Sequence, residues 1–376
     1  MNNWQTKKLG EICEIYQPKT IATKEMKKQG RYPVYGANGI IGFYDKYNHE
    51  NEEVLVTCRG STCGTVNLSE PKSWITGNAM VVTPKSEKIK KKFLYYLLMH
   101  TNLTSVISGT GQPQITRGEL SPLKIPVPPL NVQEKIVKIL DTIQEAVEIQ
   151  GKIIERTKEL KKSLMAELFK YGVPSFRKGR KLKKTEIGEI PENWQVVKFR
   201  EIFSIVAGGD ISKINFSPIK TNRFVYPIYS NTIEKKGLYG FSDTYQYESG
   251  CITVTARGTI GYAIPRFEKF NAIIRLLVLI PKIELDITFF AEFINEKVKI
   301  IFEGTSIPQL TVPKISNIKI PLPPLPVQRE IAEILKTVDA KIEIEQKKKE
   351  TYEELFKTLL NKIMSQKIDV EKMQWG

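Results

Sequence analysis

The sequence contains Pro126-Val127-Pro128-Pro129-Leu130, and Pro321-Leu322-Pro323-Pro324-Leu325 repeats this run 195 residues later. The first run leads into residues 131–171 and the second into residues 326–367, which hold almost no glycine or proline. Proline imposes an extended backbone and cannot continue a helix. Each run therefore predicts an entry segment followed by a long helix. Asn131 is placed to cap the first helix, with Glu134 completing a capping box.

Apolar residues follow a seven-residue spacing along both predicted helices. They are Ile136, Leu140, Ile143, Val147, Ile154, Leu164 and Leu168 in the first, and Ile331, Leu335, Val338, Ile342, Tyr352, Phe356, Leu359 and Ile363 in the second. A heptad stripe with charged flanks is typical of a seam with another helix. We expect the two helices to pair antiparallel with each other; packing of each helix on its own domain is the alternative.

The composition is that of a folded, globular protein. The chain has 376 residues and 41% hydrophobic content, enough for two ordinary domains and the long helices. Its apolar runs are shorter than the roughly 20 residues of a membrane span, and its first residues do not resemble a signal peptide, so we expect a cytoplasmic protein. Four cysteines and two histidines predict neither a disulfide framework nor a metal site.

The strongest functional signal in the composition is charge. The formal net charge is +16, and lysine and arginine gain affinity for nucleic acid by releasing its counterions. We therefore expect a phosphate-rich partner; a basic surface without a partner is the alternative. The densest basic cluster comprises Arg177, Lys178, Arg180, Lys181, Lys183 and Lys184.

The repetition extends beyond the proline runs. Matched steps recur in the same order: Asn3-Trp4-Gln5 with Asn193-Trp194-Gln195, Thr57-x-Arg59-Gly60 with Thr255-x-Arg257-Gly258, and Gly109-Thr110-x-x-Pro113-Gln114 with Gly304-Thr305-x-x-Pro308-Gln309. Such a repeat predicts tandem copies of one fold. Short β-rich runs between turn residues, followed by a helix over about residues 88–108 or 286–302, indicate a mixed α/β domain in each copy.

The predicted fold class is therefore α+β, with two similar mixed α/β globular domains separated by two long antiparallel coiled-coil helices in a pseudo-twofold tandem repeat. The expected boundaries are residues 1–130 for the first domain, 131–171 for the first helix, 172–190 for a basic linker, 191–325 for the second domain and 326–376 for the second helix. A forty-residue helix spans about 60 Å, so the paired helices would act as a spacer that holds the two domains apart.

In this order, these features resemble the specificity subunit of a Type I restriction-modification system. A further shared element is Thr185-Glu186-Ile187-Gly188-Glu189-Ile190-Pro191-Glu192-Asn193-Trp194, although it precedes only the second domain. The resemblance implies two target recognition domains that read the halves of a bipartite, asymmetric DNA site. It also implies that the helices bind methyltransferase subunits, of which we expect two. In the full complex they would bind restriction subunits as well. S-adenosylmethionine would then bind the methyltransferase, and this chain would bind no cofactor.

An enzyme is the main rival interpretation. The sequence has no Gly-rich loop ending in Lys-Ser or Lys-Thr and no Asp-Pro-Pro-Tyr or Asn-Pro-Pro-Tyr step. We therefore predict a non-catalytic subunit. A free-standing two-headed DNA-binding protein and a coiled-coil adaptor remain the alternatives.

Candidate DNA-binding residues are polar groups on predicted loops. Arg59 and Arg257 each precede a glycine, and arginine is the commonest bidentate partner of guanine; bracing of the loop by the arginine is the alternative. Gln112, Gln114, Arg117 and Gln309 follow the domain helices. Two domains that read different half-sites should differ at base contacts, which favours the unmatched residues Asn38, Lys46, Arg223, Lys235 and Lys236. These residues do not predict which DNA sequence is recognised, because no code relates the residues of such loops to individual bases.

Overall fold

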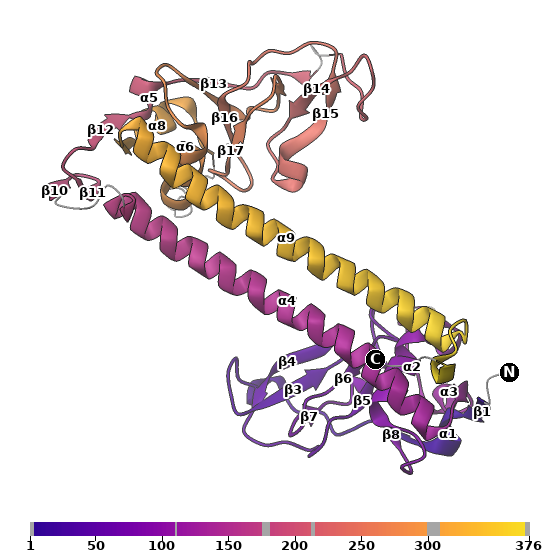
Figure 1. Cartoon of the computed structure of the whole chain (residues 1–376). Coiled ribbons are helices and arrows are strands. Elements are labelled where there is room, and N and C mark those ends of the chain that lie inside the picture. Colours follow the sequence, from indigo (N-terminus) through magenta and orange to yellow (C-terminus); the bar gives the residue numbers. More distant parts are fainter. Residues whose placement is uncertain (1–3, 110, 175–180, 212–214, 299–308, 373–376) are drawn as a thin grey trace. The chain divides into compact units, whose positions relative to one another are not determined.

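A computed structural model of the chain describes residues 4–109, 111–174, 181–211, 215–298 and 309–372. The chain divides into two compact units: unit 1 contains residues 1–152 and 346–376, and unit 2 contains residues 153–345 (Figure 1). Several residues singled out above lie outside the described residues. They are Thr110, Arg177, Lys178, Arg180, Gly304, Thr305 and Pro308.

Unit 1 contains a four-stranded antiparallel sheet, a three-stranded sheet and a two-stranded ladder. The four-stranded sheet has the order β2 (Cys13–Tyr16), β8 (Ala79–Pro84), β5 (Val54–Thr57) and β6 (Val66–Leu68). The three-stranded sheet has the order β4 (Gly39–Tyr44), β3 (Tyr32–Gly36) and β7 (Trp74–Ile75), and the ladder pairs β1 (Gln5–Lys8) with β9 (Lys124–Val127).

Unit 2 has the same sheets in the same order. Its four-stranded sheet is β13 (Phe203–Ala207), β19 (Leu277–Pro281), β16 (Cys251–Val254) and β17 (Ala263–Arg266). Its three-stranded sheet is β15 (Leu238–Ser242), β14 (Tyr226–Tyr229) and β18 (Asn271–Ala272), and its ladder pairs β12 (Gln195–Lys198) with β20 (Lys319–Leu322). A hairpin of β10 (Leu182–Thr185) and β11 (Gly188–Pro191) precedes them.

Short helices complete the two units. Those of unit 1 are α1 (Leu9–Ile12), η1 (Thr23–Glu25), α2 (Lys91–His100), η2 (Leu103–Val106), α3 (Arg117–Leu120) and η7 (Val370–Lys372). Those of unit 2 are α5 (Phe199–Ile202), η5 (Glu234–Gly237), α6 (Ile287–Phe293), the π-helix η6 (Ile294–Val298) and α8 (Val312–Ser316).

The domain helix of unit 1 is shorter than the single helix that the sequence predicted over residues 88–108. It ends at His100 because Thr101 adopts an extended backbone, and the Asn102 side chain then accepts a hydrogen bond from the Thr104 N–H and starts η2. In unit 2, α6 continues directly into η6, and residues 299–302 lie outside the described range.

The two long helices are α4 (Leu130–Tyr171) and α9 (Leu325–Met364). The capping role expected for Asn131 is wrong, because the helix already includes Leu130. The Pro129 carbonyl accepts from the Val132 and Gln133 N–H groups, and Glu134 pairs with Lys90 at 3.0 Å. α9 ends where Gln366 takes a left-handed backbone, with φ of 57°. Of the described helices, none combines the length and apolar content that crossing a lipid bilayer requires.

Each unit buries a segment of both long helices in its core, and the segments run antiparallel. In unit 1, Lys135 Nζ donates to the Glu371 carbonyl while Gly151 lies beside Lys349. In unit 2, Lys161 bonds Asp339 while Gly172 lies near Val327. The predicted fold class is confirmed in each unit: a mixed α/β domain packs on two long antiparallel helices.

A buried glutamine fixes the start of each long helix to the domain. Gln133 Oε1 accepts from the Lys90 N–H at 2.8 Å, and its Nε2 donates to the Pro128 carbonyl at 2.9 Å. Gln328 makes the matching bonds in unit 2, to the Asp286 N–H at 2.9 Å and the Pro323 carbonyl at 2.8 Å. Because Lys90 and Asp286 are the N-caps of α2 and α6, each glutamine joins a domain helix to a long helix.

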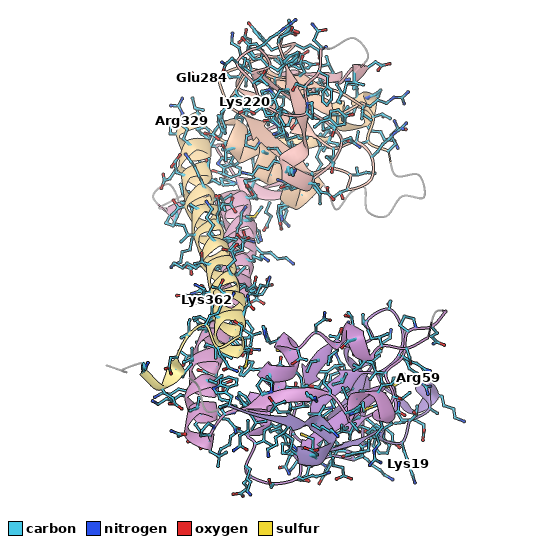
Figure 2. All side chains as sticks on the ribbon, turned by 90° about the vertical axis from the view of Figure 1, so that its right-hand side faces the viewer. Lys19, Arg59, Lys220, Glu284, Arg329 and Lys362 are labelled. Atoms are coloured by element: carbon cyan, nitrogen blue, oxygen red, sulfur yellow. The ribbon has the colours of Figure 1, made fainter. Side chains whose placement is uncertain are left out.

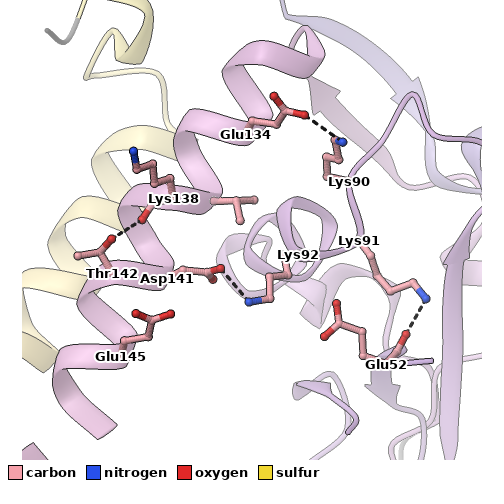
Figure 3. Close-up of a pocket in the computed structure, with 10 residues that line it drawn as sticks. Glu52, Lys90, Lys91, Lys92, Glu134, Lys138, Asp141, Thr142 and Glu145 are labelled. Carbon is pink, nitrogen blue, oxygen red and sulfur yellow. Dashed lines mark hydrogen bonds and ion pairs between the residues drawn. The ribbon is translucent and has the colours of Figure 1, made fainter. Parts of the chain in front are cut away.

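Ion pairs surround this junction in unit 1. Figure 3 shows Lys90 paired with Glu134 and Lys92 paired with Asp141, at 3.0 and 2.8 Å, across a polar cleft between α2 and α4. The Tyr96 hydroxyl also donates to Asp141, at 2.6 Å. The domain therefore meets the long helix through a buried apolar contact with a charged rim.

Candidate nucleic-acid interface

In unit 1 the chain leaves the buried strand β5 and forms a surface loop that presents Arg59. Gly60 takes a φ of +89°, a conformation that favours glycine, and its N–H donates to the Pro113 carbonyl at 3.2 Å. Arg59 forms an antiparallel bridge with Gln114. Arg59, Gln112 and Gln114 are all exposed, and Figure 2 shows Arg59 on the surface of the unit. The structure thus brings together one arginine and two glutamines that the sequence predicted as readers.

Unit 2 builds the same loop. Gly258 again has positive φ, +68°, and the Leu310 N–H donates to the Ala256 carbonyl at 2.9 Å. This bond matches the one from Ile115 to Cys58 in unit 1, at 3.0 Å. Gln309 therefore lies beside the exposed Arg257 as Gln114 lies beside Arg59. We call these two assemblies the arginine loops.

A hairpin tip is hydrogen-bonded to each arginine loop. In unit 1 the Thr57 hydroxyl donates to the carbonyl of Ala37, next to the exposed Asn38, in the turn between β3 and β4. In unit 2, Asn231 accepts from the Ala256 N–H at 2.6 Å and donates to the Arg257 carbonyl at 2.8 Å. The loop that contains Asn231 also carries the exposed residues Lys235 and Lys236.

Arg266, which the sequence interpretation missed, supports this lysine turn. Lys235 and Lys236 both adopt left-handed backbone, with φ of 46° and 56°. The Arg266 guanidinium donates to the Lys236 carbonyl at 2.8 Å and lies 3.4 Å from the centre of the Tyr229 ring. Only 3% of Arg266 is exposed, so it holds the turn from beneath while the two lysines face solvent. Apart from its charge within a β-rich run, no sequence signal marked it.

The remaining candidates lie at other places on their units. Lys46 is exposed in the turn after β4, and Arg117 is exposed at the start of α3, three residues after Gln114. Arg223 is exposed and forms an ion pair with Asp243 at 3.1 Å, in which Nε and Nη2 both donate to one carboxylate oxygen. Among the described residues, no group of three or more His, Cys, Asp or Glu side chains could hold a metal ion.

The predicted seam residues are buried or half-buried in the structure. Those buried are Ile136, Leu140, Ile154, Leu168, Ile331, Leu335 and Ile363. Those half-buried are Ile143, Val147, Leu164, Val338, Ile342, Tyr352, Phe356 and Leu359. Ile136, Leu140, Ile143, Phe356, Leu359 and Ile363 belong to the apolar cluster of unit 1, and Leu164, Leu168, Ile331 and Leu335 belong to that of unit 2, each together with residues of the domain.

One family model matches the chain twice. It describes the type I restriction modification DNA specificity domain, and it matches residues 1–159 and 191–354. The chain belongs to this family. Each match includes one arginine loop, one hairpin tip and the greater part of one long helix.

Curated relatives of the specificity family match almost the whole chain. The MjaVIII specificity subunit of a type I restriction enzyme from Methanocaldococcus jannaschii is 29% identical, covering 99% of this chain and 95% of the relative. A putative type I specificity subunit of Mycoplasma pneumoniae is 28% identical, covering 88% of each. The chain is therefore a DNA sequence-recognition subunit of the type I class, with two target recognition domains.

A solved structure shares the fold. The crystal structure of a type I S subunit from M. genitalium aligns with a TM-score of 0.68 over 96% of both chains, at 19% identity. A second structure, from work on complex assembly and conformational transition of the type I system, aligns with a TM-score of 0.59 and covers 96% of this chain. At these identities the likeness concerns the fold alone.

Proposed function

We propose that this specificity subunit reads a bipartite, asymmetric DNA site, one half with each arginine loop and its hairpin tip. The observation that carries the proposal is the pair of matched assemblies with unlike tips. Arg59 with Gln114 and Arg257 with Gln309 share one backbone frame, whereas Asn38 in unit 1 is replaced by Lys235 and Lys236 in unit 2. A shared frame with different side chains suits two readers of different sequences.

The net charge supports double-stranded DNA as the ligand. A formal charge of +16 attracts phosphates, which fix a protein on the duplex before base edges are read. Exposed lysines such as Lys46 contribute to this attraction without selecting a sequence. The arginine and glutamine side chains have the donor and acceptor geometry for guanine and adenine edges in the major groove.

We further propose that the chain is non-catalytic and works through partners. Two methyltransferase subunits dock on the long helices and supply S-adenosylmethionine, and restriction subunits join in the full complex. The length of α4 supports a spacer role, since a helix of 42 residues spans about 63 Å. The helices then set the gap between the half-sites, while the arginine loops set the halves.

The test is methyl transfer by purified components. The chain alone, with S-adenosylmethionine and DNA, should transfer no methyl group above background, whereas adding its cognate methyltransferase subunit should start the reaction. Transfer by the chain alone, with contaminants excluded by mass spectrometry, would show an enzyme. DNA binding of full specificity with no response to any methyltransferase would favour a free-standing DNA-binding protein.

A further inference from the structure

The hairpin tip of unit 2 is longer than the matching tip of unit 1. Eight residues, 230–237, join the paired residues Tyr229 and Leu238. In unit 1, four residues, 36–39, join the matching strands. The tip of unit 2 therefore contains an extension that the repeated domain plan does not need, and its two exposed lysines lie in that longer segment.

The end of this tip has an unfavourable backbone conformation. Lys235, Lys236 and Gly237 adopt consecutive left-handed conformations, with φ of 46°, 56° and 83°. The conformation suits glycine, but in other residues the Cβ atom crowds the backbone, which costs free energy. Two adjacent lysines keep it only where surrounding groups hold the chain. The positions of the two ammonium groups therefore depend on what supports the turn.

Arg266 supports the lysine turn with a guanidinium that is itself held by several groups. It donates through Nη2 to the Lys236 carbonyl at 2.8 Å and through Nε to the Thr253 hydroxyl at 2.9 Å, and it lies over the Tyr229 ring. Thr253 and Tyr229 are both buried, in β16 of the four-stranded sheet and β14 of the three-stranded sheet. Moving the guanidinium would break these bonds at a buried site, so the turn is held in one position.

Unit 1 has a serine where unit 2 has this arginine. Ser69 lies opposite Glu53, as Arg266 lies opposite Cys251. The Ser69 hydroxyl accepts a hydrogen bond from the Glu53 N–H at 2.9 Å, within its own strand pair. The buried arginine thus occurs together with the longer tip and its lysines. It belongs to one recognition domain and not to the plan that the two domains share.

We propose that Arg266 is a positioning residue that determines how unit 2 reads its half-site. It holds the lysine turn so that the Lys235 and Lys236 ammonium groups reach acceptors on base edges, next to the contacts of the arginine loop. Base edges are selected by donors at fixed positions, so a turn that shifted would lose selectivity while it kept its charge. This inference rests on the proposed function, in which the arginine loop and hairpin tip of unit 2 bind DNA.

The experiment measures base preferences at every position of both half-sites, by binding selection on randomised DNA with the full chain. Arg266→Met should reduce preference about tenfold at the positions that Lys235→Ala with Lys236→Ala also affects, and at no others. All three changes together should give the preferences of the lysine double variant, because without the lysines the arginine has no reader to position. The half-site of unit 1 should keep its preferences in every variant.

A second variant moves the turn while Arg266 remains in place. In Gly237→Ala the new Cβ atom would lie 3.1 Å from the Ser230 carbonyl oxygen, and φ is positive there, so the turn must shift. Preference should fall at the same positions as in Arg266→Met. The matched control is Ile252→Ala, in the buried apolar core of β16. It should lower the thermal unfolding temperature and leave base preferences unchanged, which separates lost stability from a displaced reader.

Three results would overturn the inference. The first is unchanged preferences in folded Arg266→Met, and Gly237→Ala decides the question if Arg266→Met does not fold. The second is uniformly weaker binding without a change of preference, which would make the arginine a purely structural residue. The third is a further loss of preference when Arg266→Met is added to the lysine double variant. A wild-type chain without base preference in either half-site would contradict the proposed function as well.

Discussion

Arg59 and Arg257 are exposed because other groups hold their loops. Backbone hydrogen bonds to residues 113 and 310, together with Thr57 and Asn231, fix the two turns. The arginine side chains are thus presented on a frame that the rest of the loop supports. Because the loop is already fixed, binding to DNA would restrict little more than the arginine side chain itself, so the loss of conformational entropy is small.

We predict that Arg59→Ala costs about 1–3 kcal/mol of binding free energy and relaxes base preference at one position of one half-site. The lost bidentate contact explains both effects, and the other half-site should keep its preferences. Selection on randomised half-sites measures this. Lys46→Ala is the control for a phosphate contact. It should weaken binding to all DNA sequences equally, and it should reduce the slope of log binding constant against log salt concentration by about one. Unchanged preferences in Arg59→Ala at unchanged stability would remove Arg59 from the readers.

At the residue scale, the sequence identifies polar candidates but not their supports. Arg59 and Gln114 stand out because a repeat preserves them and glycine or proline adjoins them. Arg266 and Asn231 do not stand out, because their partners lie about 25 to 30 residues away in the chain and no local pattern links them. The ion pair between Arg223 and Asp243 was not predicted for the same reason, because its two residues are also distant in the sequence.

At the element scale, one junction differs between the two units. In unit 1 the Tyr96 hydroxyl donates to Asp141 and Gln144, and its ring lies 5.9 Å from Phe356. In unit 2, Glu292, Asp339 and Lys161 stand where unit 1 has Tyr96, Gln144 and Phe356. The Lys161 ammonium lies 2.9 Å from Glu292 and 2.8 Å from Asp339. Burial raises the pKa of Glu292, and the Lys161 charge opposes that rise.

We predict that Lys161→Met destabilises the local structure of unit 2 by about 3 kcal/mol, because it leaves the largely buried Glu292 carboxyl without its cation and facing the partly exposed Asp339 carboxyl. Hydrogen exchange in α6 should then accelerate by about a hundredfold. The control is Lys158→Met, which breaks the exposed pair with Glu155 and should change exchange little.

A triple variant that transfers the unit 1 residues should restore slow exchange: Lys161→Phe, Glu292→Tyr and Asp339→Gln. An aromatic and amide cluster of similar volume replaces a buried ion pair at little net cost. Exchange in α6 that is unchanged in Lys161→Met would show that the triad does not hold the domain on the helices.

The elements themselves were largely predictable. Proline runs and heptads carry local information about α4 and α9, and these helices form as expected. The predicted cap at Asn131 was wrong because the Pro129 carbonyl accepts the first hydrogen bonds of the helix, which therefore starts one residue earlier, at Leu130. The roles of Gln133 and Gln328 were not predictable, since a glutamine in a helical pattern is normally solvent-exposed. Their burial depends on the domain helix that approaches them.

At the scale of the whole molecule, one domain plan occurs twice and both copies share the same two helices. The compact units do not coincide with segments of the chain, because each contains the beginning of one long helix and the end of the other. The repeat revealed the two domains. The sharing of helices follows from antiparallel pairing, which the apolar seam predicts without fixing the register.

The central claim is that this chain selects the DNA site at which its system methylates. Methylated adenines in host DNA should be mapped with and without this gene. The account predicts a bipartite motif, with two unlike halves separated by a gap of fixed length, that disappears when the gene is deleted and returns when it is restored. A methylation pattern that deletion leaves unchanged, or a lost motif that is a single continuous sequence, would contradict it.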